Sequence, residues 1–464
     1  MSWREACAAW VRAHGLDPQC LALLRAFDRT ARAGPPGALP AVEEALEAGA
    51  ADRLDRLVAS CAAEVDADQA RMFGRRFRAV DQTLADLAPG EARVLRVGLR
   101  QRLEEILAGP GPRALRVRAL ADFYGSHAGV LAWRGRGGEL AALLDPVPWR
   151  PVAPGVRHAR LDGVAEQGPL HVNLLAVDPE QVRLEVVDLH GRGTVAQLGQ
   201  GAIAAVSGGF FLYSEPDIPP PSARHDPVGL LMRAGRILNP PTMRRGSLLV
   251  GPRGVALAPL GMEAVRVGGR PVHWWNRARP GPAPWEGHAV VGDRVLPGRT
   301  RWPPLNGILL RDPVPDPVPW ALEGPWTDAV AGGPMLLQDG ESCLDREAEE
   351  FTGGAPPLTF SQDETFDQNL LPRMAVGLRD GGELVFAAVD GRNLQRALGL
   401  TLRGTGALLR QLGCHTALNL DGGSSKRMVV QGRVVDLPST EMVTGGHGGA
   451  RVRPVHTAIR VLAG

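Results

Sequence analysis

The sequence lacks the features that mark secreted, membrane-spanning or disulfide-rich proteins. Its 464 residues include five cysteines, an odd number without C-x-x-C spacing, which argues against a disulfide framework or a zinc site. The N-terminus has no charged start followed by an uninterrupted apolar run, and no segment approaches the length of a transmembrane helix. We therefore expect a cytoplasmic protein with no membrane span, whose cysteines are reduced.

Charge and nucleotide-binding motifs are also inconspicuous. The chain has 52 basic and 50 acidic residues, a formal net charge of +2, so we expect neither nucleic acid nor an anionic membrane as a partner. Neither G-x-x-x-x-G-K-[ST] nor a strand-associated G-x-G-x-x-G occurs, which argues against P-loop and dinucleotide sites. No histidine or cysteine spacing indicates a metal. We predict no metal and no cofactor.

Residues 1–145 are rich in alanine, arginine and leucine and predict an all-α N-terminal domain. Asp17 and Pro18 form a favourable helix start, because aspartate caps the helix and proline fits its first position. Leu95, Leu99 and Leu103 repeat at helical spacing after Pro89. This region carries no recognisable chemistry, so we expect it to pack against the rest of the chain or to bind a protein partner.

Residues 146–464 change to glycine, proline and short β-like runs. The segment 182–186 alternates apolar and charged residues, as a half-buried strand does. Residues 374–389 and 429–435 predict hairpins, and 399–412 predicts a helix between them. The expected fold class is α+β, with a mixed or mainly antiparallel sheet domain preceded by the helical domain.

Three glycine-centred turns follow small or apolar segments of the second domain. The first contains Ser207-Gly208-Gly209-Phe210, the second Gly332-Gly333, and the third Asn419-Leu420-Asp421-Gly422-Gly423-Ser424-Ser425. One Gly-Gly pair is usually only a tight turn or bulge. Three in one domain favour a site in which glycine amides bind an anion while Asp421 serves as acid, base or nucleophile.

These turns and their neighbours resemble the phosphodiester glycosidase family. The resemblance runs in order over about 151–462 and leaves the helical region uncovered. Besides the three turns, it rests on the segments 226–230, 235–241, 339–340, 372–377, 389–392, 399–402 and 453–455. It implies hydrolysis of a phosphate-linked sugar, with a small molecule or glycan carrying a phosphodiester as substrate.

The resemblance and the residue chemistry together suggest roles. A phosphate leaving group is a weak base, so one well-placed carboxylate and phosphate-binding donors suffice, whereas ordinary glycosidases pair two carboxyl groups. Asp421 is the expected nucleophile or general base, Asp390 a second carboxylate or a structural partner, and Arg373 a phosphate clamp. The expected substrate-binding residues are Ser207, Gly208, Gly209, Phe210, Gly332, Gly333, Asn419, Gly422, Gly423, Ser424 and Ser425.

Simpler interpretations of several residues stay open. Arg373 would otherwise pair with a carboxylate across the sheet, and Asp390 would be an ordinary turn residue. Asp226 before Pro227 is more often a turn former than an acid. Three histidines (His225, His447, His456) lie in loop-like contexts, and four tryptophans (Trp274, Trp275, Trp302, Trp326) either stack on sugar rings or are buried.

The chain departs from the family pattern at two places. Ser207 stands where an asparagine is usual, and Ser424-Ser425-Lys426-Arg427 replaces a third glycine and Ser-Ser-Thr. The added positive charge favours a more anionic ligand or indicates lost catalysis. Two alternatives to a hydrolase follow: a catalytically impaired binding module for a phosphorylated glycan or nucleotide-sugar, and a scaffold for partner contacts made by the helical region.

Overall fold

The computed structural model describes residues 67–87, 90, 113–212, 218, 220–276, 286–304, 306–344, 369–439 and 452–464, with scattered residues of 92–103. The predicted helix at Asp17-Pro18 lies outside these residues. No helix in the described part of the chain is long and apolar enough to cross a membrane.

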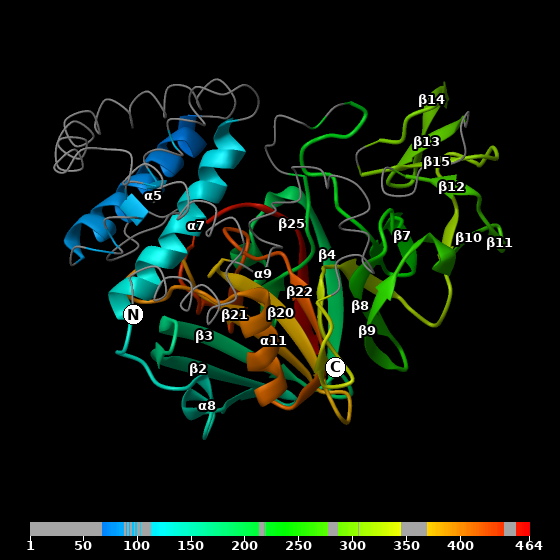
Figure 1. The fold of residues 1–464 in the computed structure, drawn as a ribbon. Coiled ribbons are helices and arrows are strands. Elements are labelled where there is room, and N and C mark those ends of the chain that lie inside the picture. The colour runs from blue at the N-terminus through cyan, green and yellow to red at the C-terminus, as the bar shows by residue number, and fades with distance from the viewer. Residues whose placement is uncertain are drawn as a thin grey trace.

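The described N-terminal part is helical, as predicted. Helices α5 (Ala67–Asp86) and α7 (Arg113–Trp133) pack side by side at one end of the molecule, and the short α8 (Leu140–Leu143) follows (Figure 1). Leu99 and Leu103 of the predicted stripe are helical and buried against this pair, in a cluster with Phe77 and Tyr124. Leu370, Leu394 and Leu398 of the following domain belong to the same cluster, so the helices share this apolar core with the rest of the chain.

An eight-stranded antiparallel sheet is the largest element of the remaining chain. Its strand order is β1-β2-β3-β21-β20-β22-β18-β19. The bounds are β1 Arg150–Ala153, β2 Val156–Ala165, β3 Gly168–Val177, β18 Met335–Gln338, β19 Glu341–Ser342, β20 Arg373–Arg379, β21 Leu384–Val389 and β22 Cys414–Leu420. Helix α11 (Leu402–Gln411) packs on one face, with Leu408 and Leu409 against Ala375 and Ala417.

A five-stranded antiparallel sheet, in the order β24-β23-β5-β25-β4, packs on the other face of the eight-stranded sheet. It consists of β4 (Val182–Gly193), β5 (Ala204–Ser207), β23 (Met428–Val430), β24 (Arg433–Val434) and β25 (Val455–Ala463), with the short helix α9 (Val195–Leu198) beside it. Val206 and Ile459 of this sheet share one apolar cluster with Met374 and Phe386 of the larger sheet.

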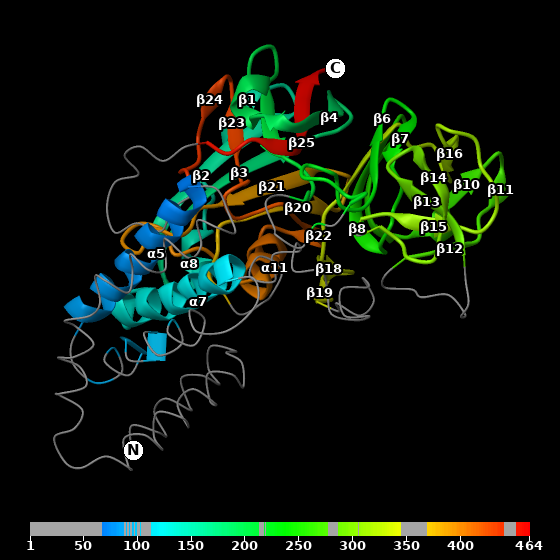
Figure 2. The same cartoon turned by 90° about the horizontal axis from the view of Figure 1, so that it is seen from above.

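A second five-stranded sheet, β7-β6-β17-β8-β9, continues the same core, through Leu231, Leu248 and Val330. Its strands are β6 (Leu231–Arg233), β7 (Arg236–Asn239), β8 (Arg245–Gly251), β9 (Gly254–Leu260) and β17 (Asp328–Ala331). Two small sheets lie beyond it, on the side of the molecule opposite the helices (Figure 2): β11-β10-β16 and β12-β15-β13-β14. Their strands are β10 (Val265–Val267), β11 (Arg270–Pro271), β12 (Trp274–Trp275), β13 (Gly287–Val291), β14 (Arg294–Thr300), β15 (Ile308–Leu310) and β16 (Trp320–Leu322), with a 3-10 turn at Met262–Ala264.

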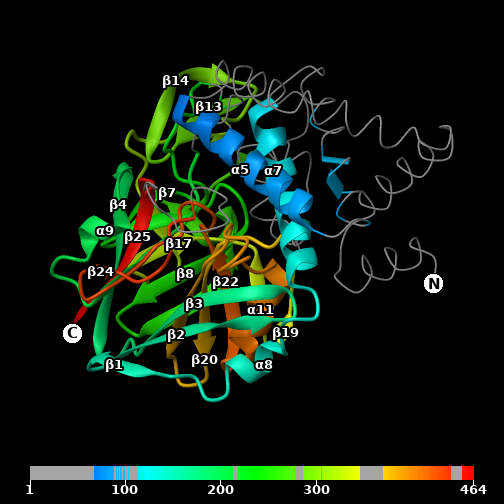
Figure 3. The same ribbon diagram turned by 90° about the vertical axis from the view of Figure 1, so that its left-hand side faces the viewer.

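The predicted secondary structure agrees with these elements where it was specific. The strand at 182–186 is the start of β4, and the two hairpins are β20–β21 and β23–β24. The predicted helix is α11, whose N-cap Thr401 accepts a hydrogen bond from the Gly404 amide. The α+β fold class with mainly antiparallel sheets is confirmed. Figure 3 shows α5 and α7 lying across one end of the large sheet.

Candidate active site

The three glycine turns meet where the three larger sheets join. The first follows β5, the second connects β17 to β18, and the third connects β22 to β23, so each sheet contributes a turn. The Asp421 amide of the third turn donates to the carbonyl of Gly208 in the first, at 3.0 Å. The Gly333 amide of the second turn donates to the carbonyl of Asn419, beside the third, at 2.7 Å. The predicted convergence of the turns is therefore present in the fold.

Two of the glycines are required by how closely the turns approach. A Cβ atom at Gly209 would lie 2.3 Å from the carbonyl oxygen of Ala331, which connects the first turn to the second. A Cβ atom at Gly332 would lie 2.3 Å from the carbonyl oxygen of Asn419, which connects the second turn to the third. Any side chain at these positions would push the turns apart.

The glycine amides of the predicted anion cradle are largely used inside the protein. Five of them donate to protein acceptors: Gly208 to Thr457 O, Gly209 to Thr457 Oγ1, Gly332 to Gly246 O, Gly333 to Asn419 O and Gly423 to Pro372 O. Within the described part of the chain, the amides of Gly422 and Ser424 have no acceptor. The hydrogen-bond donors of the turns that remain for a ligand are therefore these two amides and the side chains.

Asp421 follows β22 directly and is buried, with 5% of its surface exposed. The hydroxyl of Ser207 lies beneath it, donating to the Asp421 carbonyl at 3.5 Å and accepting from the Arg427 amide at 3.2 Å. The side-chain amide of Asn419 donates to the Gly333 carbonyl at 2.9 Å. Ser207 and Asn419 therefore fix the backbone around Asp421 by side-chain bonds.

Arg373 begins β20, next to β22, and its side chain is 1% exposed. Its Nε donates to the Leu400 carbonyl at 3.0 Å and its Nη2 to the Asn369 carbonyl at 3.2 Å. The third glycine turn packs directly on its backbone, because the Gly423 amide bonds the carbonyl of the preceding Pro372. These contacts place Arg373 beside the turn and hold its guanidinium in one orientation.

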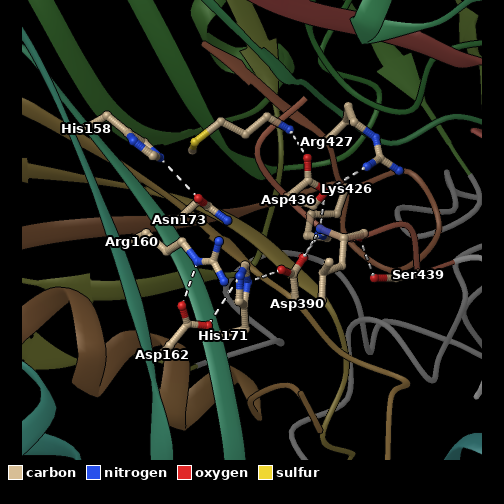
Figure 4. Close-up of polar contacts among 12 residues, drawn as sticks. His158, Arg160, Asp162, His171, Asn173, Asp390, Lys426, Arg427, Asp436 and Ser439 are labelled. Carbon is tan, nitrogen blue, oxygen red and sulfur yellow. Dashed lines mark hydrogen bonds and ion pairs between the residues drawn. The ribbon is translucent and has the colours of Figure 1, made fainter. Parts of the chain in front are cut away.

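Asp390 follows β21 and belongs to a buried charged cluster, drawn in Figure 4. Its Oδ1 pairs with the Lys426 ammonium and accepts from the Leu437 amide at 3.0 Å, and its Oδ2 contacts His171 Nδ1. Lys426 also bonds Asp436 Oδ2 at 2.6 Å. Asp390 is therefore a buried ion-pair partner of Lys426, and its role as a second catalytic carboxylate stays a prediction.

Electrostatics keep Asp390 ionised. Burial by itself would raise the pKa of this carboxyl group, but Lys426 and His171 hold its pKa below the ordinary value. His171 Nε2 also lies 3.4 Å from Asp162, a half-exposed carboxylate on β2 that Arg160 binds at 2.6 Å. An ionised carboxylate held by an ammonium group is a poor proton donor.

Lys426 and Arg427 are neutralised within the protein. Lys426 makes three bonds, to Asp390, Asp436 and the Leu437 carbonyl, which use its three ammonium protons. Arg427 Nη1 donates to Asp436 at 3.0 Å. These contacts leave Lys426 no donor for a ligand, so the expected preference for a more anionic ligand does not come from this residue and stays a prediction. Lys426 is the only lysine in the sequence, a compositional signal that the motif comparison overlooked.

Two buried arginines near the turns were missed from the sequence. Arg392 bonds Asp122 of helix α7 through two parallel contacts of 2.9 Å and donates to the Ser424 hydroxyl at 3.3 Å. Arg245 donates to the Gly332 carbonyl at 2.6 Å, and its guanidinium lies 4.8 Å from the centre of the Phe210 ring. Burial was the missing information, because 51 arginines give no reason to select these two.

The other candidates lie elsewhere. Asp226 accepts from the Ala223 amide, as a turn former does, and burial raises its pKa. His456 lies in strand β25 and not in a loop, and it contacts Asp188 at 3.2 Å, whereas His447 is outside the described residues. Trp274 is buried in β12, and Trp302, which follows β14, is 80% exposed. No group of three or more metal-binding side chains occurs among the described residues.

Of the five cysteines, the structure describes two, Cys343 and Cys414, and both are free thiols. Burial raises the pKa of Cys414 to about 12, so its thiol is unreactive.

Comparison with known proteins identifies a shared domain. Residues 308–462 match the model of a family described as phosphodiester glycosidase. This segment includes the second and third glycine turns, Arg373 and Asp390, whereas the first turn lies before it.

Two curated proteins match shorter segments. The mouse N-acetylglucosamine-1-phosphodiester alpha-N-acetylglucosaminidase is 31% identical over 136 residues, which is 29% of this chain and 24% of the mouse protein. A prophage-derived, uncharacterized protein of Bacillus subtilis is 42% identical over 81 residues, 17% of this chain and 12% of that protein. The chain thus covers a quarter or less of the length of these relatives.

Solved structures also resemble the chain. A hypothetical protein from Synechocystis aligns with a TM-score of 0.45 and 19% identity, over 69% of this chain and 64% of its own. The catalytic domain of zebrafish N-acetylglucosamine-1-phosphodiester alpha-N-acetylglucosaminidase, auto-inhibited by its pro-peptide, aligns with a TM-score of 0.42 and 14% identity, over 70% of this chain and 94% of that domain.

Proposed function

We propose that this protein is a hydrolase that cleaves the glycosidic bond of a sugar 1-phosphodiester, a function that the match of residues 308–462 to the phosphodiester glycosidase family supports. The observation that carries the proposal is the position of Asp421. Its buried side chain stands at the junction of three glycine turns from three sheets, next to two amides that have no acceptor among the described residues. A carboxylate beside anion-binding donors suits a substrate that carries a phosphate next to an electrophilic carbon.

The reaction breaks the bond between the anomeric carbon and the phosphate oxygen. That oxygen and the bonding electron pair leave with the phosphate monoester, and water supplies the hydroxyl group of the released sugar. Asp421 acts in one of two ways: it attacks the anomeric carbon to form a glycosyl ester that water then hydrolyses, or it takes the proton of the attacking water. No strong acid is needed, because a phosphate leaves without prior protonation.

The phosphate group would be bound by fewer hydrogen-bond donors than the three glycine turns were expected to supply. We assign the amides of Gly422 and Ser424, the hydroxyls of Ser424 and Ser425, and the guanidinium of Arg373, which adjoins the third turn. The other glycines of the three turns would shape the site through close packing and not as donors. The mouse relative's name points to N-acetylglucosamine 1-phosphodiesters as the first substrates to assay. A cytoplasmic location stays a prediction.

The direct test is hydrolysis by the purified full chain. We expect release of a phosphate monoester from a sugar 1-phosphodiester, and a loss of at least about 1,000-fold in kcat for Asp421→Asn, because an amide is neither a nucleophile nor a base. Asp339→Asn is the matched control. Asp339 is exposed, has a left-handed φ of 51° that asparagine tolerates, and lies in the β18–β19 turn. Equal activity of Asp421→Asn and wild type would refute the assignment.

A second candidate function is a binding module for a phosphorylated glycan or nucleotide-sugar. It is favoured by the state of Asp390, because buried contacts with Lys426 and His171 hold this carboxylate, whereas ordinary glycosidases use two carboxyl groups for catalysis. Saturable binding of a sugar 1-phosphate without turnover, weakened by Arg373→Ala, would support the module. Turnover that Asp421→Asn removes would exclude it.

A further inference from the structure

We propose that Asp122, on helix α7 of the N-terminal region, is a positioning residue for the Ser424 hydroxyl and acts through Arg392. The inference rests on the proposed function, because Ser424 is one of the assigned phosphate donors. It makes the helical region a structural part of the site, and neither a separate partner-binding module nor a scaffold. No recognisable chemistry was predicted for that region from its sequence.

The contact between the helix and the site is a continuous buried chain. Asp122 Oδ1 accepts from Arg392 Nε and its Oδ2 from Arg392 Nη2, both at 2.9 Å. Arg392 Nη1 then donates to Ser424 Oγ at 3.3 Å and to the Ser439 carbonyl at 3.3 Å. Asp122 is 0% exposed, Arg392 is 2% and Ser424 is 6%. A two-point contact fixes the plane of the guanidinium, so Asp122 determines where Nη1 points.

The backbone of Arg392 also depends on this contact. Its φ is 59°, in the left-handed region that residues other than glycine rarely adopt. Such a conformation persists where the surrounding contacts hold it. Arg76 of helix α5 approaches Asp122 Oδ2 at 3.4 Å. Helix α7 thus supplies the carboxylate, and helix α5 supplies a second arginine that contacts it.

The consequence for Ser424 is a directed hydroxyl proton. A hydroxyl that accepts from a guanidinium has its own proton free for another acceptor, and it becomes a stronger donor because the two bonds polarise each other. Ser424 directly follows Gly423 in the third turn, so that proton is available to the phosphate of the substrate. Without Asp122, the guanidinium would turn, and the hydroxyl would lose its orientation.

Other contacts attach the helix to the sheet domain without reaching Ser424, and they supply matched controls. The Ser126 hydroxyl accepts from the Leu370 amide at 3.0 Å, one turn of α7 after Asp122. Trp133 Nε1 donates to the Leu394 carbonyl at 2.9 Å. Ser126 also donates to the main-chain carbonyl of Asp122 at 2.8 Å, but none of these bonds involves the Asp122 carboxylate. We therefore expect substitution of these residues to loosen the docking of the helix and to leave the Asp122–Arg392–Ser424 chain intact.

The experiment compares Asp122→Asn, Asp122→Glu, Ser126→Ala and Trp133→Phe in the full chain. We expect Asp122→Asn to lower kcat/KM for a sugar 1-phosphodiester by about 10- to 100-fold, mainly through kcat, because a small misplacement of a donor has effects of that size. Asp122→Glu, which keeps the charge and the fold, should show a smaller loss in the same direction. Ser126→Ala and Trp133→Phe should stay within about twofold of wild type.

Hydrogen exchange gives a readout that needs no substrate. The Ser425 and Lys426 amides bond to the Gly422 carbonyl within the turn. We expect these amides to exchange faster in both Asp122 variants than in the two controls. Unchanged exchange and unchanged kcat/KM in Asp122→Glu would overturn the inference, as would a gain of activity in either Asp122 variant, which would show that the carboxylate obstructs Arg392. If the amides exchange faster in both Asp122 variants but the wild-type chain shows no turnover, the proposed function is refuted and the positioning role is supported.

Discussion

Asp390 and Arg392 lie two residues apart after strand β21, yet their charges are handled in opposite ways. Asp390 is neutralised inside the sheet domain, by Lys426 and His171. Arg392 is neutralised by Asp122, which lies 270 residues earlier on helix α7. The first cluster pairs two carboxylates (Asp390, Asp436) with two cations (Lys426, Arg427), whereas the second places two arginines (Arg76, Arg392) around one carboxylate.

The difference separates a cluster whose charges are paired with one another from one that contacts a proposed ligand-binding residue. The Asp390 cluster is balanced, and its lysine has no remaining donor, so it holds the third turn to the sheet and offers nothing to a substrate. In the Asp122 cluster, Arg392 also contacts Ser424 directly. A cation next to a predicted phosphate donor favours an anionic substrate. A charged residue close to the third glycine turn is therefore not by that fact alone a residue that acts on the substrate.

The largest effect on stability should come from Lys426→Met. The substitution leaves Asp390 and Asp436 buried without their shared ammonium group, and breaking a buried pair in this way costs about 3–5 kcal/mol of unfolding free energy. Urea unfolding of the full chain measures the loss. The triple variant Lys426→Met, Asp390→Asn, Asp436→Asn removes the anions as well and should recover much of it.

The pH dependence checks the cause of that loss. In the wild type the Asp390 pKa is lowered, so its contribution to stability is present above the ordinary pKa of aspartate and is lost as the pH falls through the lowered value. Without Lys426, burial would raise the Asp390 pKa, and protonation would relieve the unpaired charge. The stability difference between wild type and Lys426→Met should therefore shrink as the pH falls. A difference that stays constant from pH 7 to pH 4 would contradict an electrostatic cause.

Arg392→Met should be the milder disruption. Asp122 keeps Arg76 at 3.4 Å, so the variant does not leave an isolated buried anion, and the loss should be about 1.5–3 kcal/mol, the range for hydrogen bonds to charged groups. Activity should fall by more than this modest destabilisation explains, since Ser424 loses its donor. Unfolding and kcat/KM measured at the same temperature separate the two effects. If Arg392→Met destabilises as much as Lys426→Met, the comparison between the clusters fails.

The sequence predicted what local patterns determine. The hairpins β20–β21 and β23–β24 and helix α11 follow from alternating and helical periodicities, and the glycine turns follow from their composition. The partners of buried charges were beyond such patterns. Asp122 lies in a segment without a motif, and its approach to Arg392 depends on how two helices pack on Leu370 and Leu394. Likewise, no pattern showed that the glycine amides bond to Thr457, Gly246 and Pro372.

The smallest effect should come from an uncharged contact next to the site. Thr401 caps helix α11, with its hydroxyl oxygen 2.9 Å from the Gly404 amide, and it directly follows Leu400, whose carbonyl binds Arg373. Thr401→Ala should cost about 1 kcal/mol of unfolding free energy, the usual value of an N-cap, and Thr401→Ser should restore most of it. Activity should not change, because the Leu400 carbonyl is a backbone group that the cap does not contact. A loss of activity in Thr401→Ala with wild-type activity in Thr401→Ser would instead show that the cap fixes Arg373, and that neutral contacts also position the site.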